Sequence, residues 1–409
     1  MPTKNSSNNK PLRIALLTYS TKPRGSVVHT LELAEALAEL GHEPHVFALD
    51  KDGKGFYRAV RCQTFAVPAS PCEAGIDQLI RQRIGEFVAF FEDFLAVSSE
   101  VSLDVEDTRY DVYHAQDCLS ANALAELKAR GKISCFVRTV HHVEAYKSEY
   151  LRDCQEKSIY QSDRCLCVSE VWQQVLKADY GVEAHRVTNG VSRRFSPKLA
   201  TEPATEPLTE RSAAELALAK AMGLDLAAGP IYLTVGGIEP RKNSIRLLRA
   251  FGQVRSHFPN AKLIIAGGAT LFDYQDYRAD FMAIAAAENM LSALILPGVV
   301  PDADLPDLYR LADAFVFPSV QEGWGLVVLE AIASGLPVLV SDRAPFTEFL
   351  TGAAAQMVNP EDLNAIAHAM MEMVKPEVAR SLVERSAPIA ERFRWQRSAE
   401  MHLELYRSL

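Results

Sequence analysis

Two carboxylates stand at the ends of an otherwise uncharged stretch, Glu322-Gly-Trp-Gly-Leu-Val-Val-Leu-Glu330. A carboxylate can accept hydrogen bonds from two neighbouring hydroxyls, so this pair suits a polyhydroxylated ligand. Gly323 and Gly325 disfavour a helix at the start of the stretch, so we expect Glu322 in a loop and a helix that begins near Gly325. Glu330 then lies two turns inside that helix, whose first N–H groups would attract a phosphate. The alternative is a helix-capping acid at 322 and a solvated helix residue at 330.

A second group of residues with chemical potential is Gly236-Gly-Ile-Glu-Pro-Arg-Lys-Asn243, directly after an apolar run that ends at Val235. Glycines that follow a strand let a ligand approach the backbone closely. Arg241 and Lys242 can neutralise a diphosphate, the arginine as a fork and the lysine as a point charge. Cations are unfavourable at a helix N-terminus, so a bound anion would help to explain them. The alternative is two ordinary surface cations.

The elements that must position these groups follow a repeated strand–helix–strand pattern. In the first half, short apolar runs predict strands at Leu12–Thr18 and His45–Leu49, with a helix from Val27 to Leu40 that stops at Gly41. This unit implies a parallel sheet with right-handed crossovers. The same pattern predicts further strands at Val112–His114, Cys135–Val140, Arg164–Val168, Ile231–Val235, Ala261–Ala266, Leu294–Leu296, Ala314–Phe317 and Pro337–Val340, and a helix at Ser244–His257.

The chain therefore reads as α/β, with two doubly wound Rossmann-like domains. At 409 residues it is too long for one ordinary core, which agrees with two domains of similar size. Ligands of such folds bind at the carboxyl ends of the strands, so we expect a cleft facing those ends of both sheets. We place the domains at residues 1–196 and 230–392, with 393–409 as a final helix.

Residues 197–229 form the expected linker or insertion between the domains. The run Thr201-Glu-Pro-Ala-Thr-Glu-Pro-Leu-Thr-Glu210 is polar and has too little apolar content to pack, so we expect it to be exposed. A helix from about Ser212 to Met222 is expected to end the segment.

Composition excludes several classes of protein. The net charge of -9 argues against a broad nucleic-acid-binding surface. No stretch approaches the ~20 apolar residues that span a bilayer, and the apolar run after Arg13 is too short for a signal peptide. All seven cysteines lie between Cys62 and Cys167. We interpret them as reduced, mostly buried thiols of a cytoplasmic protein.

Taken together, the motifs of the second half resemble the donor-binding domain of a retaining glycosyltransferase of family 4, with the GT-B architecture. In particular the chain resembles a bacterial subgroup that carries Gly-Gly-Ile-Glu-Pro-Arg-Lys. The order and spacing of the runs make the resemblance far more specific than a lone glycine motif. The matching runs are Gly236–Asn243, Leu263–Gly268, Pro297–Val300, Leu308–Asp313 and Pro318–Pro337.

The resemblance implies a role for each residue of the donor site. Glu322 would contact hydroxyls of the donor sugar, Glu330 the ribose diol and Lys242 the diphosphate. The base would meet backbone groups of Val299 and Val300. Donor contacts of the backbone or side chains would further come from Gly236, Gly237, Arg241, Gly323, Trp324, Gly325 and Leu326.

Position 237 departs from the family pattern, which has a second diphosphate-binding arginine where this chain has Gly237. Arg241 or Arg24 would supply the missing charge, or phosphate binding would rely more on Lys242. These alternatives stay open in the sequence.

The first half resembles the family's acceptor domain less closely. The family's Gly-Gly phosphate loop corresponds to Arg24-Gly25, so both residues are donor-site candidates. Tyr113-His-Ala-Gln-Asp117 resembles the family's His-x-His-Asp element, which makes His114 a catalytic candidate beside Lys242 and Glu322. A lone histidine is more often structural, and that alternative applies here too. The acceptor-site candidates are His141, His142, Tyr146, Lys147 and Arg152.

The family's usual reaction, which the resemblance implies here, retains configuration without an enzyme nucleophile. The leaving diphosphate would be stabilised by Lys242 and by backbone N–H groups, and it would accept the acceptor's proton. We expect no cofactor and no required metal, because Asp302-Ala-Asp304 matches an ordinary surface loop of this family. The final helix, Phe393–Tyr406, would cross back to the first domain, with Trp395, Met401, Leu405 and Tyr406 as packing groups.

We therefore expect transfer of a hexose, with UDP-glucose as the first guess for the donor, to a glycan or lipid-linked acceptor in polysaccharide or glycolipid biosynthesis. The alternatives are a GT-B-fold epimerase or phosphorylase, and a catalytically inactive protein that binds a nucleotide sugar. A lipid-linked acceptor would bring the protein to the inner face of the membrane. The segment from Gln78 to Leu95 gives a weak amphipathic signal, although its acids favour a core-packed helix. The sequence leaves the oligomeric state open.

Overall fold

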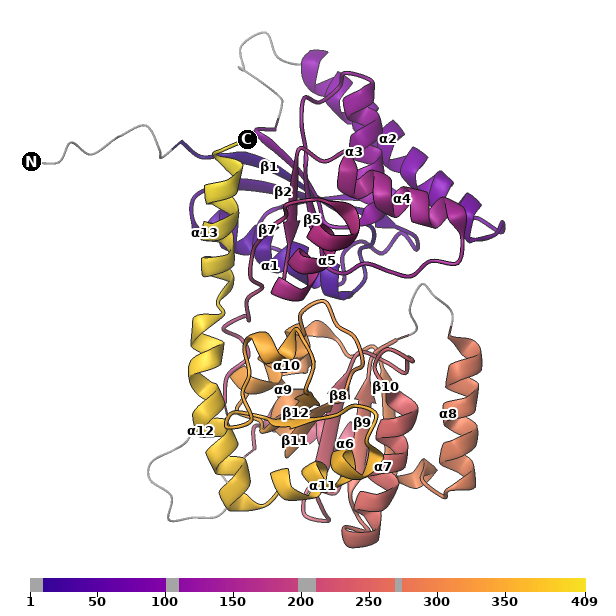
Figure 1. The fold of residues 1–409 in the computed structure, drawn as a ribbon, viewed down its shortest axis with the longest axis vertical. Coiled ribbons are helices and arrows are strands. Elements are labelled where there is room, and N and C mark those ends of the chain that lie inside the picture. The colour runs from indigo at the N-terminus through magenta and orange to yellow at the C-terminus, as the bar shows by residue number, and fades with distance from the viewer. Residues whose placement is uncertain (1–9, 101–109, 198–210, 269–273) are drawn as a thin grey trace, which may run out of the picture. The chain divides into compact units, whose positions relative to one another are not determined.

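The computed structural model describes residues 10–100, 110–197, 211–268 and 274–409 (Figure 1). The chain divides into two compact units, one of residues 1–189 with 395–409 and the other of residues 190–394. Residues 190–196, which the sequence placed in the first domain, thus group with the second unit. The predicted exposed run 201–210 lies outside the described residues. The helix expected after it is α6 (Ala213–Ala221), capped by Ser212 and Met222.

The first unit is a parallel sheet covered by helices. Among its described residues, seven strands lie in the order β3-β2-β1-β4-β5-β6-β7. The strands are β1 (Arg13–Thr18), β2 (Glu43–Asp50), β3 (Gln63–Pro68), β4 (Val112–Ala115), β5 (Val137–Val140), β6 (Arg164–Cys167) and β7 (His185–Arg186). The helices are α1 (Gly25–Glu39), α2 (Ile76–Glu100), α3 (Cys118–Ala129), α4 (Glu149–Tyr160), α5 (Glu170–Tyr180) and α13 (Trp395–Tyr406).

The second unit repeats this architecture with six parallel strands in the order β10-β9-β8-β11-β12-β13. They are β8 (Ile231–Val235), β9 (Lys262–Ala266), β10 (Leu294–Gly298), β11 (Ala314–Phe317), β12 (Val338–Ser341) and β13 (Gln356–Val358). The α-helices besides α6 are α7 (Ser244–His257), α8 (Gln275–Ala287), α9 (Leu305–Leu311), α10 (Leu326–Ala333), α11 (Leu363–Met373) and α12 (Pro376–Arg392). The described residues of this unit also form the short 3-10 helices η1 (Leu291–Ala293), η2 (Asp302–Asp304) and η3 (Phe346–Glu348).

These two sheets confirm the predicted fold class of two doubly wound α/β domains. Each predicted strand is present, with ends that shift by at most two residues, because a strand buried on both faces needs a continuous apolar run. Three edge strands were not predicted. β3 is exposed at most of its positions, and β7 and β13 have two and three residues. Such strands carry no apolar run long enough to be recognised.

Helix α2, which gave the weak amphipathic signal, is a core helix. Phe87 and Phe91 are fully buried, and the Phe91 ring lies 4.6 Å from that of Phe47 in β2. Among the described helices, none combines the length and the apolar character that crossing a bilayer would require.

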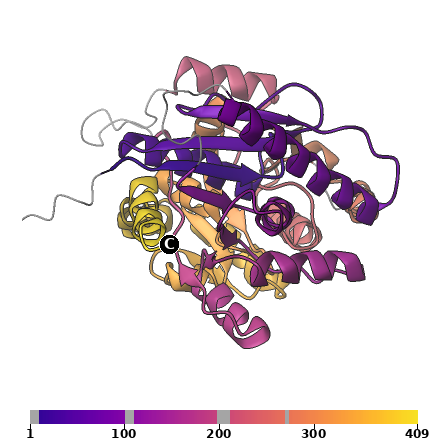
Figure 2. The ribbon, with the colours of Figure 1, turned by 90° about the horizontal axis from the view of Figure 1, so that it is seen from above.

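Helix α13 belongs to the first unit and packs against α1; Figures 1 and 2 show this yellow C-terminal segment beside the indigo N-terminal elements. Trp395, Leu403 and Tyr406 are buried, and Met401 and Leu405 are half-buried. The side chains expected to pack therefore do so.

The chain passes between the units twice, at Asn189–Gly190 and at Arg394–Trp395. The two passages meet on the second unit, where Val191 forms a parallel bridge with Arg394 and its N–H donates to the carbonyl of Phe393 at 3.0 Å. We call residues 190–197 and 393–394 the two crossing segments.

Candidate functional site

The loop that carries Glu322 depends on a glycine at the start of α10. Gly325 caps this helix with a φ of +105°, and a Cβ there would lie 2.6 Å from Cε1 of Phe346. A side chain is excluded by both the backbone and the neighbour. The helix begins at Leu326, as predicted, so Glu330 is its fifth residue. It lies just past the first turn and not two turns in, which corrects the sequence interpretation.

Glu322 is buried, with 8% of its surface exposed, and is held by two cations and a hydroxyl. Its Oε1 accepts hydrogen bonds from Lys242 Nζ at 2.8 Å and from Ser319 Oγ at 2.9 Å, and Arg241 Nη1 lies 2.8 Å away. Burial would raise the pKa of this carboxyl, but the charges of Lys242 and Arg241 with these hydrogen bonds outweigh it and lower the pKa to about 2. The carboxylate is therefore ionised and fixed in orientation.

Lys242 is not an ordinary surface cation. Its side chain is 12% exposed, and its ammonium lies 4.4 Å from the centre of the Phe317 ring. Burial, together with the charge of Arg241, lowers the pKa of Lys242, while Glu322 opposes this shift. Arg241 is one-third exposed and also donates to the Gln321 carbonyl at 3.2 Å. Two predicted diphosphate cations and the predicted sugar-binding acid thus form one ion cluster.

Gly237 is required by the backbone. It has a φ of +80°, and a Cβ there would lie 2.8 Å from the carbonyl oxygen of Gly268. Gly236 before it has a φ of +137°, and a Cβ there would lie 2.9 Å from Cε of Lys242. The family's arginine therefore has no room at position 237 in this conformation. Any second cation has to come from another residue, and in this unit Arg241 is already in the cluster.

Glu330 is oriented by a residue that the sequence interpretation did not assign to the site. Its Oε2 accepts a hydrogen bond of 2.7 Å from the hydroxyl of Tyr309, which is fully buried in α9. Burial, and then the charge of Glu330, raise the pKa of Tyr309 well above its usual value. The tyrosine lies in one of the runs that match the family, Leu308–Asp313. The sequence therefore pointed to this run, but it did not predict the hydrogen bond to Glu330.

Trp324 directs its side chain into the unit. Its ring stacks on Phe349 at 5.0 Å and meets Phe393 edge-on at 5.3 Å. Only 5% of Trp324 is exposed, and its Nε1 has no hydrogen-bond partner among the described residues. This anchoring leaves the backbone of Gly323 and Leu326, both half-buried, for the predicted contacts.

The donor candidates of the second unit lie at or near the carboxyl ends of the strands of its sheet. Gly236 follows β8, Gly267 follows β9, and Val299 follows β10. A Cβ on Gly268 would lie 2.7 Å from Cγ2 of Val299, which is 55% exposed, whereas Val300 is buried. The Glu322 loop follows β11, the neighbour of β8 at which the strand order reverses. This is the switch point at which doubly wound sheets bind their ligands.

Comparison with known families agrees with this geometry. Residues 227–389 match the model described as "Glycosyl transferases group 1", and residues 23–194 match "Glycosyltransferase Family 4". The two matches together cover most of both units. The protein is a glycosyltransferase.

Curated relatives of this glycosyltransferase act on different substrates. The chain is 25% identical to D-inositol 3-phosphate glycosyltransferase of Corynebacterium urealyticum, over 97% of this chain and 96% of that one. It is 31% identical to O-antigen chain mannosyltransferase B of Escherichia coli, over 43% of this chain and 45% of the relative. That second match therefore spans less than half of either protein.

Solved structures confirm the GT-B fold class. Sucrose-phosphate synthase from Thermosynechococcus elongatus superposes with a TM-score of 0.76 at 21% identity, over 97% of this chain and 98% of that one. Anabaena HepE in complex with UDP-glucose gives 0.74 at 17% identity, over 97% and 100%. At these identities the likeness concerns the fold alone.

In the first unit of the glycosyltransferase, the catalytic candidate His114 is fully buried. Its Nδ1 pairs with the Tyr406 hydroxyl at 2.6 Å and its Nε2 with Thr139 Oγ1 at 2.7 Å. Burial lowers the pKa of His114 well below its usual value. In this conformation neither ring nitrogen is left for a substrate, which favours the structural alternative. Its catalytic role stays a prediction.

His114 belongs to a cluster of four histidines that joins α1, β4, the loop after β5 and α13. The His29 ring lies 4.7 Å from that of His141 and 5.9 Å from that of His402, and the His402 ring lies 5.7 Å from that of His114. Burial lowers the pKa of His29 to about 3 and of His402 to about 4. His29 and His402 were not predicted as cluster members, because they lie in α1 and α13, which are far apart in the sequence.

The acceptor candidates lie in the loop between β5 and α4 and in the first turn of α4. His141 pairs through Nε2 with Gln116 Oε1 at 3.2 Å, whereas His142 is exposed and pairs with Glu144 at 2.7 Å. Arg152 donates to the backbone carbonyls of Tyr146 at 3.1 Å and Lys147 at 3.0 Å. The guanidinium thus stabilises the loop that would hold an acceptor.

Arg24 and Gly25, the remaining donor candidates, begin α1. Arg24 caps the helix in an extended conformation, and its Nη1 donates to the Pro23 carbonyl at 3.3 Å. A Cβ on Gly25 would meet nothing within 4 Å, so the backbone here does not require glycine. Asp302, in the loop expected not to bind a metal, is paired with Arg194, whose Nη2 lies 2.9 Å from Oδ1.

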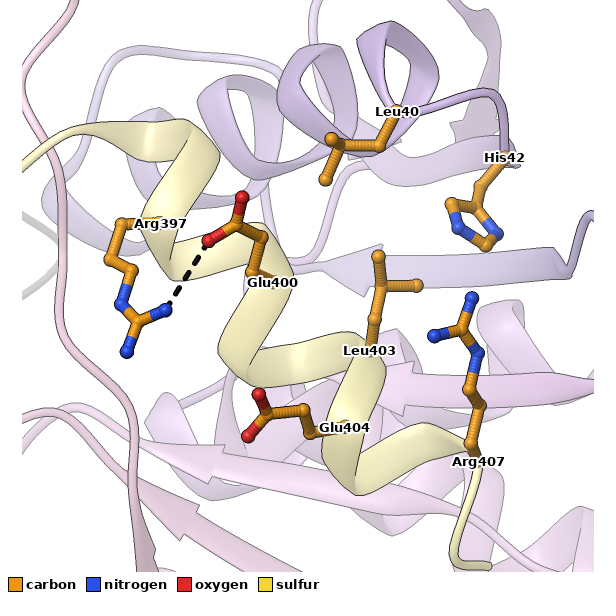
Figure 3. Close-up of a pocket in the computed structure, with 7 residues that line it drawn as sticks. All are labelled: Leu40, His42, Arg397, Glu400, Leu403, Glu404 and Arg407. Carbon is orange, nitrogen blue, oxygen red and sulfur yellow. Dashed lines mark hydrogen bonds and ion pairs between the residues drawn. The ribbon is translucent and has the colours of Figure 1, made fainter. Parts of the chain in front are cut away.

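A pocket of about 310 Å³ lies in the first unit between α1 and α13 (Figure 3). It is lined by Leu40, His42, Arg397, Glu400, Leu403, Glu404 and Arg407, and none of these is a predicted site residue. Its charges are of both signs, and Arg397 is paired with Glu400 at 3.4 Å. The pocket is separate from the donor and acceptor candidates.

Proposed function

We propose that this glycosyltransferase moves a hexose from a nucleoside diphosphate sugar, with UDP-glucose as the first candidate, to a glycan or lipid-linked acceptor. The observation that carries the proposal is the cluster of Glu322 with Lys242 and Arg241 at the switch point of the second sheet. The cluster places a fixed acceptor of hydrogen bonds beside two cations. A sugar attached to a diphosphate needs both.

The phosphates would lie against the glycines after β8 and β9. Gly236, Gly237 and Gly267 present backbone without side chains, so a diphosphate can approach this edge closely. Their own N–H groups donate to the carbonyls of Ala266 and Gly298, so the charge of the diphosphate would be met by side chains. The cations then neutralise part of its charge. A donor that contains UDP and glucose is supported by the name of the Anabaena complex, which shares this fold.

Glu322 would accept hydrogen bonds from sugar hydroxyls. Its pKa of about 2 keeps it ionised at neutral pH, so it offers only acceptors. The ion pair with Lys242 fixes its direction before the donor arrives, which lowers the cost of ordering at the moment of binding. Glu330, just past the first turn of α10, would bind the ribose diol.

For the chemical step we propose front-side attack with retention. The acceptor oxygen bonds to the anomeric carbon on the face from which the diphosphate departs, and the carbon–oxygen bond to the phosphate breaks. The acceptor's proton passes to an oxygen of the leaving diphosphate, whose charge Lys242 and Arg241 stabilise. We propose that these two cations suffice and that no metal or organic cofactor takes part.

Donor turnover tests the proposal. We expect the protein to release UDP slowly from UDP-glucose in the presence of EDTA, and to retain the anomeric configuration when an acceptor is supplied. Tight binding of UDP-glucose without turnover would instead identify a catalytically inactive binding protein. Conversion of UDP-glucose to another UDP-sugar without release would identify an epimerase.

The acceptor requires a screen, because its candidates His141, His142, Tyr146, Lys147 and Arg152 lie in the less similar first unit. The screen should include glycans, lipid-linked sugars and inositol phosphate, since some relatives are named for that last acceptor. A lipid-linked acceptor would support the proposed place in polysaccharide or glycolipid biosynthesis at the cytoplasmic face of a membrane. Flotation with liposomes that carry the accepted lipid would test that location.

A further inference from the structure

The contact between Tyr309 and Glu330 joins two elements of the second unit. The tyrosine lies in α9 and the glutamate in α10, and the phenol donates to Oε2 at 2.7 Å. The same hydroxyl lies 3.3 Å from the Val327 carbonyl, a longer and weaker contact. The proton of the phenol is therefore directed to the carboxylate.

The ring of Tyr309 is held by aromatic neighbours. Phe195 meets it edge-on at 5.5 Å with an interplanar angle of 90°, and Phe315 lies 5.7 Å away. Tyr309 is fully buried, and Phe195 belongs to the crossing segment 190–197. The packing of the ring thus fixes the position of the hydroxyl.

The chemistry of the phenol suits a permanent donor. Burial and the nearby carboxylate raise the pKa of Tyr309 well above its usual value, so it stays protonated at neutral pH. A carboxylate has acceptor positions on both oxygens, so it can accept from a phenol and from ligand hydroxyls at the same time. Without such a partner, the long side chain of a glutamate loses rotamer freedom when a ligand binds, and this loss weakens binding. The hydrogen bond from the phenol removes that freedom beforehand.

We propose that Tyr309 is a positioning residue that orients Glu330 and thereby makes the enzyme prefer ribose over 2′-deoxyribose in its nucleotide. The inference rests on the proposed function, in which Glu330 binds the ribose diol. With the carboxylate fixed, both hydroxyls of the diol are bound at once. A 2′-deoxynucleotide has lost one of those hydroxyls and gains little from the fixed orientation.

The test compares UDP with 2′-deoxy-UDP by calorimetry on the whole chain. Tyr309→Phe removes one oxygen and keeps the ring. We expect it to raise the Kd of UDP by about tenfold, as for the loss of a hydrogen bond to a charged group. The Kd of 2′-deoxy-UDP should change much less, so that the preference for ribose falls.

A matched control is available in the same unit. Tyr232 is also fully buried, and its hydroxyl donates to the Met370 carbonyl at 2.9 Å. Tyr232→Phe removes an equivalent oxygen, and we expect it to leave both Kd values unchanged. A second variant, Glu330→Gln, should reduce the preference by itself, and Tyr309→Phe should add little in that background.

The outcomes separate the inference from the function on which it rests. Wild-type protein that binds neither UDP nor 2′-deoxy-UDP overturns the proposed UDP-sugar function, and the inference with it. Wild-type protein that binds both equally overturns the ribose role of Glu330. Wild-type protein that prefers UDP, with the full preference retained in Tyr309→Phe, overturns the inference about Tyr309 alone. An equal loss of both nucleotides in Tyr309→Phe overturns it too.

Discussion

Phe393 and Trp395 lie two residues apart, yet they pack into different units. The Phe393 ring lies 5.3 Å from Trp324 in the second unit, and the Trp395 ring lies 5.2 Å from His29 in the first. Arg394 between them bridges to Val191 of the other crossing segment. Each crossing segment thus packs against a residue that lies beside a donor candidate. Phe393 backs Trp324 beside Glu322, and Phe195 backs Tyr309, which holds Glu330.

Replacement of Phe393 should therefore affect donor binding. We expect Phe393→Ala to lower the free energy of unfolding of the second unit by about 3 kcal/mol, as for other buried aromatic residues. We also expect a several-fold rise in the Kd of UDP, because Trp324 loses an edge of its packing. Phe281→Ala is the control, since Phe281 is fully buried in the same unit's other core cluster. Denaturant unfolding and calorimetry would check both, and equal nucleotide affinities in the two variants would contradict the role of Phe393.

A side chain at position 237 should damage the protein and not restore a family feature. Gly237→Arg supplies the arginine of related sequences, but the backbone has a φ of +80° and the carbonyl of Gly268 stands 2.8 Å from a Cβ. We expect Gly237→Ala to cost about 1–3 kcal/mol of stability and Gly237→Arg to abolish UDP binding. Gly352→Ala, where a Cβ meets nothing within 4 Å, should be neutral. Tighter UDP binding by Gly237→Arg would show that the loop rearranges freely.

Replacing one partner of the Lys242–Glu322 ion pair should lower the free energy of unfolding. Lys242→Met removes the more buried of the two cations that hold the ionised Glu322 carboxylate, and we expect a loss of about 3 kcal/mol at pH 7. The double variant Lys242→Met/Glu322→Gln should recover much of that loss, because neither position of the buried pair then carries a charge. Thermal unfolding of the single and double variants would check this, and simple additivity would contradict the pairing.

The same pair predicts an acid-dependent loss of stability. The folded pKa of Glu322 is lowered to about 2. Its contribution is therefore fully present above its unfolded value of about 4.5, and it is lost as the pH falls through the folded value. Denaturant titrations between pH 5 and 2 should show a smaller decline in Glu322→Gln than in the wild type. Parallel curves would mean that the carboxyl has an ordinary pKa.

The histidine cluster predicts a loss of stability at milder acidity. Unfolded histidines take up protons near pH 6.5, whereas His29 and His402 stay neutral down to about 3 and 4. The unfolded chain binds more protons in this window, so stability falls as the pH drops below 6.5. These two residues alone should cost about 3 kcal/mol between pH 6.5 and 5.

Denaturant unfolding followed by tryptophan fluorescence would measure this dependence, with Trp395 beside His29 as a probe. His402→Met should reduce the loss by about half of the value for the pair, since one titrating group is gone. A free energy of unfolding that stays flat from pH 7 to 5 would be incompatible with buried imidazoles that stay neutral at positions 29 and 402.

Much of the fold follows from local sequence, and little of the site's detail does. The strand Ile231–Val235 and the helix Ser244–His257 were predicted to the residue, because each has a continuous apolar pattern and a clear end. The helix start at Gly325 followed from two glycines. The hydrogen bond from Tyr309 to Glu330, by contrast, needs two helices to be placed side by side, and no local pattern specifies that.

The first unit shows the same limit more strongly. The Tyr406 hydroxyl that occupies His114 comes from α13, nearly three hundred residues later in the chain. A motif predicts which residue types recur, but not which distant side chain forms their hydrogen bonds. Similarly, residues 190–196 lack a composition change that would assign them to the second unit. The Phe195–Tyr309 contact does so in the structure.

The first unit is formed by two separate parts of the chain, and this fixes when it can be completed during synthesis. Residues 395–409 emerge from the ribosome only after the whole of residues 190–394, yet they supply Trp395, His402 and Tyr406 to the interior of the first unit. Until then His29 and His114 have no cover from α13. The part of the chain that is made first is therefore completed after the second unit has been made, and a nascent chain released early carries an open histidine cluster on its N-terminal half.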